Sequence, residues 1–146
     1  MRGLGSGAGR VRRASRMIGA GAVLAVVSLG GCATRDADAA RATEAVVGFY
    51  EAFAAGDGAA ACQALSEQAV HEVEKSSSKS CAEGIVDEQL DDPGQHVDTE
   101  VFGDEALATF ESDTAFVTHV GSTWLVAAAG CEPKAGEPYD CTIQGG

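Results

Sequence analysis

The sequence predicts an α+β domain, in which three N-terminal helices pack on one face of a curved antiparallel sheet of four to five strands. Apolar residues recur at steps of three and four between residues 41 and 90, which is the period of an amphipathic helix. After Gly94 the period drops to two, as in half-buried strands. Short polar turns separate these later segments, and such tight spacing indicates antiparallel hairpins.

The first predicted helix begins at Arg41. Its apolar residues fall on one helical face: Ala42, Val46, Phe49, Tyr50 and Phe53. Gly56 is expected just past its carboxyl end, where a left-handed backbone suits glycine. The preceding segment ATRDADAA, residues 33–40, is small and polar, so we expect residues 32–42 to form a tether.

Two further helices are predicted from caps and periodicity. Asp57 suits the N-cap of a second helix, which the polar residues 76–80 end. Its inner stripe is expected at four positions: Cys62, Leu65, Ala69 and Val73. Ser80 and Glu83 have the spacing of a capping box, which predicts a short third helix ending before Pro93.

Alternating segments predict four strands, and a fifth is expected after a turn near Gly136. The expected strands are His96–Phe102, Ala106–Glu111, Thr114–Val120, Thr123–Ala129 and roughly Tyr139–Ile143. In the third strand the bulkier set is Phe116 and Val120, which predicts that His119 lies on the face away from the core. Val117 shares the face of His119, so the opposite register stays open.

The amino-terminal residues predict export. Residues 2–16 contain five arginines and no acid, and residues 18–29 are apolar or small. A basic start followed by a short apolar stretch with small residues at its end is typical of a secretory signal peptide. The stretch is shorter than the roughly 20 apolar residues that a membrane-spanning helix needs.

Leu29-Gly30-Gly31-Cys32 resembles the lipobox of bacterial lipoproteins. The resemblance implies a lipoprotein signal peptide over residues 1–31, cut before Cys32, and a diacylglyceryl group on the Cys32 thiol. An ordinary signal peptide followed by an unrelated cysteine is the alternative. Two acyl chains are enough for stable anchoring, so we expect a lipid-anchored protein on the extracytoplasmic side of the cell membrane.

The charge of the chain excludes nucleic acid as a partner. The sequence has 10 basic and 22 acidic residues, a net charge of −12. Cleavage before Cys32 would leave five basic residues against the same 22 acidic ones, a net charge of −17. Such a surface repels phosphates and anionic lipid headgroups, so attachment to the membrane must come from the lipid on Cys32.

The other four cysteines predict disulfides, because an even set in an exported domain is typical of them. Three pairings are possible, and we favour Cys62–Cys81 and Cys131–Cys141 because each pair brackets one local element. A zinc site is the rival interpretation, but CxxC pairs are missing and the three histidines are scattered. We therefore expect neither a metal nor a cofactor.

Two segments carry a family resemblance. The helix AVVGFYEAFAAGD, with the two later helices and the meander sheet, resembles the NTF2-like (SnoaL-like) α+β cone over roughly residues 43–145. The ending WLVAAAGC with PYDC is similar to a group of small actinobacterial lipoproteins without an assigned activity. The resemblance implies an NTF2-like domain over residues 43–146, with a pocket between the first helix and the sheet. It also implies that a catalytic member would use a histidine with an aspartate or tyrosine.

Candidate groups for such chemistry lie on the predicted strands and on the first helix: His96, His119, Asp98, Glu100, Tyr50 and Tyr139. A lone strand histidine is usually a surface residue or a satisfied one, and His71 is expected to be solvated between glutamates. No Ser–His–Asp grouping, glycine-rich phosphate loop or paired-carboxylate motif is discernible. We therefore expect no catalytic residues.

Two functions remain as hypotheses. We expect a non-enzymatic binding or interaction module of the cell envelope, for an envelope protein or a small apolar ligand. The alternative is a small-molecule enzyme of isomerase or dehydratase type on the same scaffold. A histidine enclosed beside a carboxylate would favour the enzyme, and a pocket filled by Phe49, Phe53 and Trp124 would favour the module.

Overall fold

A computed structural model of the chain describes residues 31–136 and 138–145. The helices are α1 Gly31–Ala54, α2 Gly58–Ala64, α3 Glu67–Ser77, α4 Cys81–Gly84 and the 3₁₀ turn η1 Ile85–Asp87. The strands are β1 His96–Phe102, β2 Glu105–Phe110, β3 Thr114–Val120, β4 Thr123–Glu132 and β5 Asp140–Gln144. The signal peptide expected over residues 1–31 lies outside the described residues except for Gly31, and of Cys32 only its place in α1 is described.

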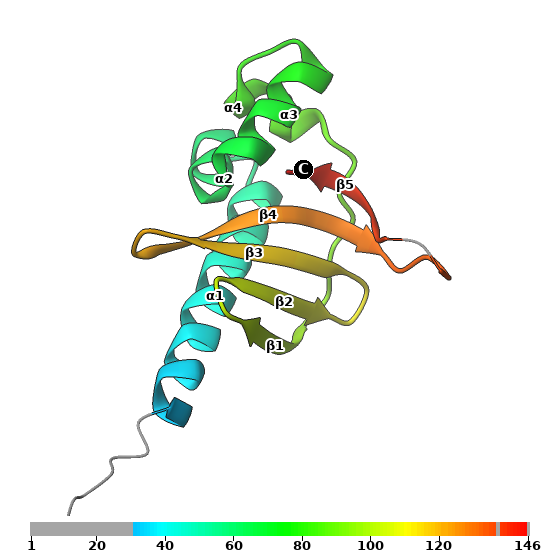
Figure 1. Ribbon diagram of the computed structural model, residues 1–146. Coiled ribbons are helices and arrows are strands. Elements are labelled where there is room, and N and C mark those ends of the chain that lie inside the picture. Colours follow the sequence, from blue (N-terminus) through cyan, green and yellow to red (C-terminus); the bar gives the residue numbers. More distant parts are fainter. Residues whose placement is uncertain (1–30, 137, 146) are drawn as a thin grey trace, which may run out of the picture.

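All five strands pair with their sequence neighbours in one antiparallel sheet, in the order β1-β2-β3-β4-β5. The long helix α1 crosses behind the sheet, and the shorter helices gather at its β4–β5 side (Figure 1). Helices followed by a meander sheet confirm the predicted α+β class, and the layout is consistent with an NTF2-like arrangement. Such a layout buries one sheet face under α1 and leaves the other without a described helix.

The core lies between α1 and the inner face of the sheet. Val46 and Phe49 of α1 are fully buried there. The strand residues that face them are largely small, with Ala108 and Ala115 buried beside Val117. Small side chains let the helix axis approach the sheet closely, so the alanine-rich strands suit a bulky aromatic helix.

The segment expected to be a tether, residues 32–42, is helical and begins α1. The segment is rich in alanine, the best helix former, and the packed part of α1 supplies a nucleus for it to extend. Residues 34–37 are exposed, and these turns project beyond the sheet (Figure 1).

The second predicted helix is two helices. The chain turns extended at Leu65, which forms a parallel bridge with Val126 of β4. The Ser66 backbone N–H donates to the Val126 carbonyl over 2.8 Å, and the Ser66 hydroxyl accepts from the Ala69 N–H to cap α3. The sheet thus provides the hydrogen-bond acceptor for the Ser66 N–H, which a continuous helix would have provided from its own backbone. Periodicity alone misses such a break because Leu65 stays on the inner face.

The predicted caps are partly correct. The Asp57 carboxylate accepts from the Ala60 N–H over 3.0 Å, as expected for an N-cap. The Ser80 hydroxyl bonds the Glu83 carboxylate over 2.7 Å, and it makes no hydrogen bond to a backbone N–H of the helix. The third helix is correspondingly short, because α4 passes into η1 after one turn.

The expected register of the third strand is wrong. Ala115 and Val117 are buried on the inner face, so His119 shares the core side. Phe116 lies on the outer face, where its ring packs edge-on against Tyr139 with centroids 5.1 Å apart. At these positions of β3 the inner face holds the smaller residues Ala115 and Val117, and Tyr139 covers the large ring of Phe116 outside.

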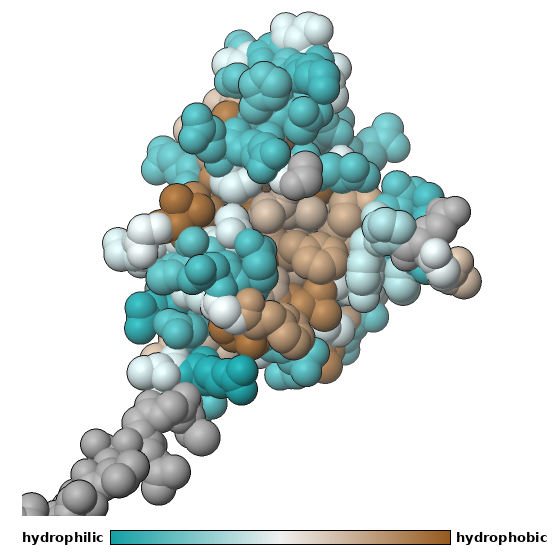
Figure 2. Space-filling model, viewed as in Figure 1, coloured by the Kyte–Doolittle hydropathy of each residue, from teal (hydrophilic) through white to brown (hydrophobic). Residues whose placement is uncertain are grey.

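The outer face of the sheet carries an apolar patch. Half-buried side chains of β2, β3 and β4 face each other across the strands there: Leu107, Phe116 and Ala128. Figure 2 shows this patch near the centre of the molecule, bordered by hydrophilic side chains.

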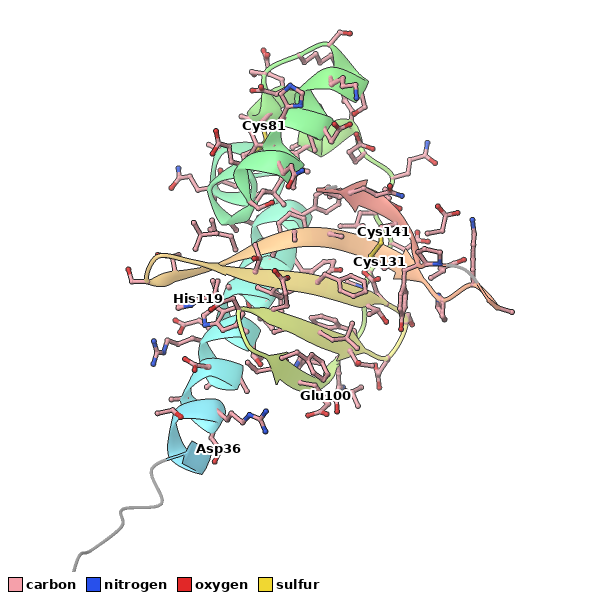
Figure 3. The ribbon with its side chains drawn as sticks, in the orientation of Figure 1. Asp36, Cys81, Glu100, His119, Cys131 and Cys141 are labelled. Carbon is pink, nitrogen blue, oxygen red and sulfur yellow. A yellow bond between two sulfur atoms is a disulfide. The ribbon has the colours of Figure 1, made fainter. Side chains whose placement is uncertain are left out.

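The two expected disulfides are present. Cys62 of α2 is bonded to Cys81 of α4, with their Cα atoms 6.1 Å apart. Cys131 and Cys141 face each other across β4 and β5 and are also bonded (Figure 3). Disulfides persist in oxidising compartments, so they suggest an extracytoplasmic location.

Gly130 marks a close approach inside the fold. It interrupts β4 with φ +66°, and a Cβ built there would lie 2.5 Å from Cδ1 of Leu90. Leu90 belongs to the segment that links η1 to β1, and it packs against the core. A side chain at position 130 would therefore force the Leu90 side chain to move and would also crowd Thr142, whose Cβ would be 3.0 Å away.

We expect Gly130→Ala to destabilise the protein more than Gly103→Ala. Both glycines have positive φ, but a Cβ at Gly103 would meet no atom within 4 Å. The left-handed backbone penalty is shared, and the clash at Gly130 should add about 1–3 kcal/mol to the loss of unfolding free energy. Equal losses for the two variants in denaturant unfolding would contradict this packing.

Candidate functional site

A groove of about 530 Å³ opens between the carboxyl half of α1, residues 90–95 and the β1–β2 edge of the sheet. Its walls are apolar or aromatic: Val47, Tyr50, Phe53, Leu90, Pro93 and Phe110. Polar side chains lie among them and at the rim: Glu51, Asp91, Asp92, Gln95 and His96. An apolar hollow of this size with a few polar groups is typical of a small-molecule site.

The Tyr50 hydroxyl anchors the deep wall of the groove. It donates a short hydrogen bond to the carboxylate of Asp113 in the β2–β3 turn. The same carboxylate accepts from the backbone N–H groups of Cys131 over 2.8 Å, Gly130 over 3.1 Å and Thr114 over 2.5 Å. Asp113 therefore ties α1 to β3 and β4 at one end of these two strands.

Burial raises the pKa of the Tyr50 phenol well above its ordinary value, and the hydrogen bond to Asp113 and the negative charge of that carboxylate raise it further. The phenol consequently stays protonated and donates to Asp113. It offers the groove the face of its ring and no free hydroxyl.

An aromatic cluster supports the groove from the sheet side. The Phe110 ring meets Tyr50 edge-on at 5.1 Å and meets the His96 imidazole edge-on at 5.5 Å. Phe49 packs edge-on against Tyr50 from the core, with centroids 5.2 Å apart. Edge-to-face pairs are favourable, and they hold these rings in one arrangement.

A chain of two hydroxyl groups connects Nε2 of His96 to a backbone carbonyl oxygen of α1. Its Nε2 lies 2.8 Å from the Thr99 hydroxyl, which lies 2.8 Å from the Thr43 hydroxyl. Thr43 in turn lies 2.8 Å from the carbonyl oxygen of Ala39, which can only accept. All three contacts are hydrogen bonds only if Thr43 donates to Ala39, Thr99 to Thr43 and His96 to Thr99. For a neutral imidazole, this pattern corresponds to the tautomer with its proton on Nε2.

His119 lies elsewhere on the inner face. Its ring stacks on Trp124 with centroids 4.8 Å apart, and its Nδ1 is 3.7 Å from a carboxylate oxygen of Asp104. Its Nε2 is buried without a hydrogen-bond partner among the described residues, as is the indole N–H of Trp124. Neither ring lines the groove. The stack packs the β3–β4 hairpin, and Figure 3 shows His119 at that end of the sheet.

The structure brings together only part of the predicted candidate set. Tyr50 and His96 both line the groove. Asp98 and Glu100 are exposed on β1 on the side away from α1, and Glu100 lies at the lower edge of the sheet in Figure 3. Tyr139 packs on Phe116 outside, and His71 is exposed beside Glu72.

Sequence reasoning missed Asp113 and the acidic rim. In the sequence Asp113 only stands between two predicted strands, and its partners on β4 are 17 and 18 residues away. Glu51 follows Tyr50 of the apolar stripe, and Asp91 and Asp92 stand just before Pro93, where the third predicted helix ends. The negative net charge indicates many acidic residues, but it does not say which of them lie together at a site.

A second, polar depression of about 260 Å³ lies on the other side of Asp113. It is lined by acids from four segments: Asp91 and Asp92, Asp113, Glu132 and Asp140. Even so, within the described part of the chain no group of three or more histidine, cysteine, aspartate or glutamate side chains is placed to hold a metal ion.

Comparison of the chain with protein-family models, with curated proteins and with solved structures gives no match.

We expect Tyr50 to ionise only when the protein unfolds. The unfolded chain releases this proton near pH 10, whereas the folded chain keeps it, so the unfolded state binds fewer protons above that pH. The contribution of Tyr50 to stability is thus complete below pH 10 and declines as the pH rises further. In the Tyr139→Phe variant Tyr50 is the only tyrosine, so tyrosinate absorbance should appear together with the loss of circular dichroism.

The Tyr50→Phe variant is the control, and its unfolding free energy should fall less steeply in alkali. Tyrosinate absorbance that rises in Tyr139→Phe while the dichroism stays native would contradict the buried Tyr50–Asp113 pair.

Proposed function

We propose that the protein is an exported lipoprotein of the cell envelope, anchored through Cys32, that binds a small and mostly apolar ligand without catalysing a reaction. The observation that carries the binding role is the groove beside α1, which stays open although the aromatic residues around it are abundant. Phe49 and Trp124 are buried in the core, and Phe53 lines the groove without filling it.

The polar groups around the groove favour binding over catalysis. The Tyr50 hydroxyl and the Asp113 carboxylate bond each other. The hydrogen bond of His96 goes to Thr99, and no described carboxylate lies within ion-pair distance of its ring. General acid–base chemistry needs a positioned pair whose proton can move to a substrate, and these groups are already committed within the protein. The isomerase or dehydratase alternative therefore has less support.

The anchored location rests on three observations. The lipobox-like residues 29–32 precede the domain, and two disulfides stabilise it in an oxidising compartment. The exposed residues 34–37 at the start of α1 would hold the domain away from the membrane, because they lie ahead of the packed part of the helix. Among residues 31–136 and 138–145, none of the helices has the length and hydropathy of a membrane span.

We expect Val47→Phe to abolish ligand uptake by the groove. Val47 is a half-buried wall residue, and a larger ring at this position would occupy the space that a ligand needs. The neutral apolar dye Nile red should bind the folded protein, and its affinity should fall by about tenfold or more in the variant. Dye fluorescence titrations give both values.

Gly48→Phe is the matched control, because it places the same ring on the next residue of α1, outside the groove, where a Cβ would meet no atom within 4 Å. Equal loss of dye binding in both variants, or no binding to the unchanged protein, would remove the support for this site.

We expect Cys32→Ala to release the protein from membranes, because it removes the thiol that carries the lipid. The unchanged protein should partition into detergent, and the variant should appear in the aqueous phase or as an uncleaved precursor. Unchanged detergent partitioning of the variant would contradict lipidation at this residue.

A further inference from the structure

The groove beside α1 has a marked imbalance of charge. Three of its lining side chains are carboxylates, from Glu51 on α1 and from Asp91 and Asp92 on the segment before β1. No lysine or arginine lines it, and none of the three carboxylates forms an ion pair among the described residues. A ligand that enters the groove therefore meets an uncompensated negative potential.

The remaining polar groups are also mainly acceptors. Because the hydroxyl chain takes the Nε2 proton of His96, the neutral imidazole has only the Nδ1 lone pair left for a ligand. The backbone N–H groups at the rim are already used, with Gly94 donating to Asp92 over 2.9 Å and Gln95 donating to Glu111 over 3.0 Å. Apart from the Gln95 amide, the polar side chains of the groove would therefore pair best with a ligand that donates hydrogen bonds.

The aromatic walls of the groove favour an organic cation over a metal ion. Phe53, Phe110 and Tyr50 offer aromatic surface, which attracts organic cations through the ring quadrupole but does not replace the water shell of a metal ion. A volume of about 530 Å³ also suits a molecule of drug size.

We propose that the ligand is an apolar organic cation, a protonated amine or quaternary ammonium that carries an alkyl or aromatic body. This inference rests on the proposed function, in which the groove is a ligand site. The apolar body lies against the aromatic walls, and the cationic head lies at the rim beside Glu51 and Asp91. The net charge of −12 also attracts such a ligand from a distance.

The test uses three probes with one phenylalkyl body and different heads: a trimethylammonium, a hydroxyl and a sulfate. Their affinities for the exported, disulfide-bonded protein are measured by calorimetry at low ionic strength and again at high salt. The ammonium probe should bind tightest and the sulfate probe weakest, and salt should reduce the difference because it screens the rim charges.

Two variants locate the charge effect. Glu51→Gln and Asp91→Asn should each weaken the ammonium probe about two- to fivefold and leave the hydroxyl probe unchanged. Asp92 is kept because its carboxylate also holds the Gly94 turn. The controls are Asp98→Asn and Glu100→Gln, which remove the same charge from the far side of β1 and should leave all three affinities unchanged.

The outcomes separate this inference from the proposed function. Binding of all three probes with equal affinity, or tightest binding of the sulfate probe, would overturn the cationic ligand while leaving the groove as a binding site. Equal weakening by the rim variants and the control variants would also overturn it, since only net charge would then matter. If no probe binds and Nile red also fails to bind, the groove itself is not a ligand site.

Discussion

The carboxylate of Asp113 is the point on which the arrangement of this fold depends. Asp113 lies in the β2–β3 turn. Its carboxylate accepts a hydrogen bond from the Tyr50 hydroxyl of α1 and hydrogen bonds from the backbone N–H groups of Gly130 and Cys131 of β4. A charged acceptor with several aligned donors is among the stronger polar interactions available to a protein. Through it, the helix and the sheet are held together at one end of the core, where apolar packing alone would allow the helix to slide.

The groove follows from that constraint. Tyr50 is turned toward Asp113, so its ring becomes a fixed wall, with Phe110 edge-on against it and His96 edge-on against Phe110. Gly130 lets Leu90 approach β4, and the segment that follows Leu90 closes the groove on its other side. The hydroxyl chain from His96 to Ala39 fixes the remaining polar group. The shape and polarity of the groove are therefore consequences of interactions that also stabilise the fold.

Elements with strong local signals were predictable. The bounds of β1 and β3, the Asp57 cap and both disulfide pairs are as expected, because alternation, capping and short loops are local properties. The break at Leu65 and the inward position of His119 were not predictable in the same way. Each depends on a partner far along the chain, Val126 for the first and Tyr139, through Phe116, for the second. At the site, Tyr50 and His96 were among the candidates, whereas Asp113 and the rim acids were not.

By itself the sequence determined the α+β order and the acidic composition, and it favoured the cysteine pairing that the structure shows, because each is encoded in neighbouring residues or in composition. Only the tertiary structure decided which face of β3 is buried, where the helices break and that an open groove with an acidic rim lies beside α1. The physical reason is that these features arise where segments far apart in sequence meet. Close packing and hydrogen bonding select among local alternatives that have similar energies.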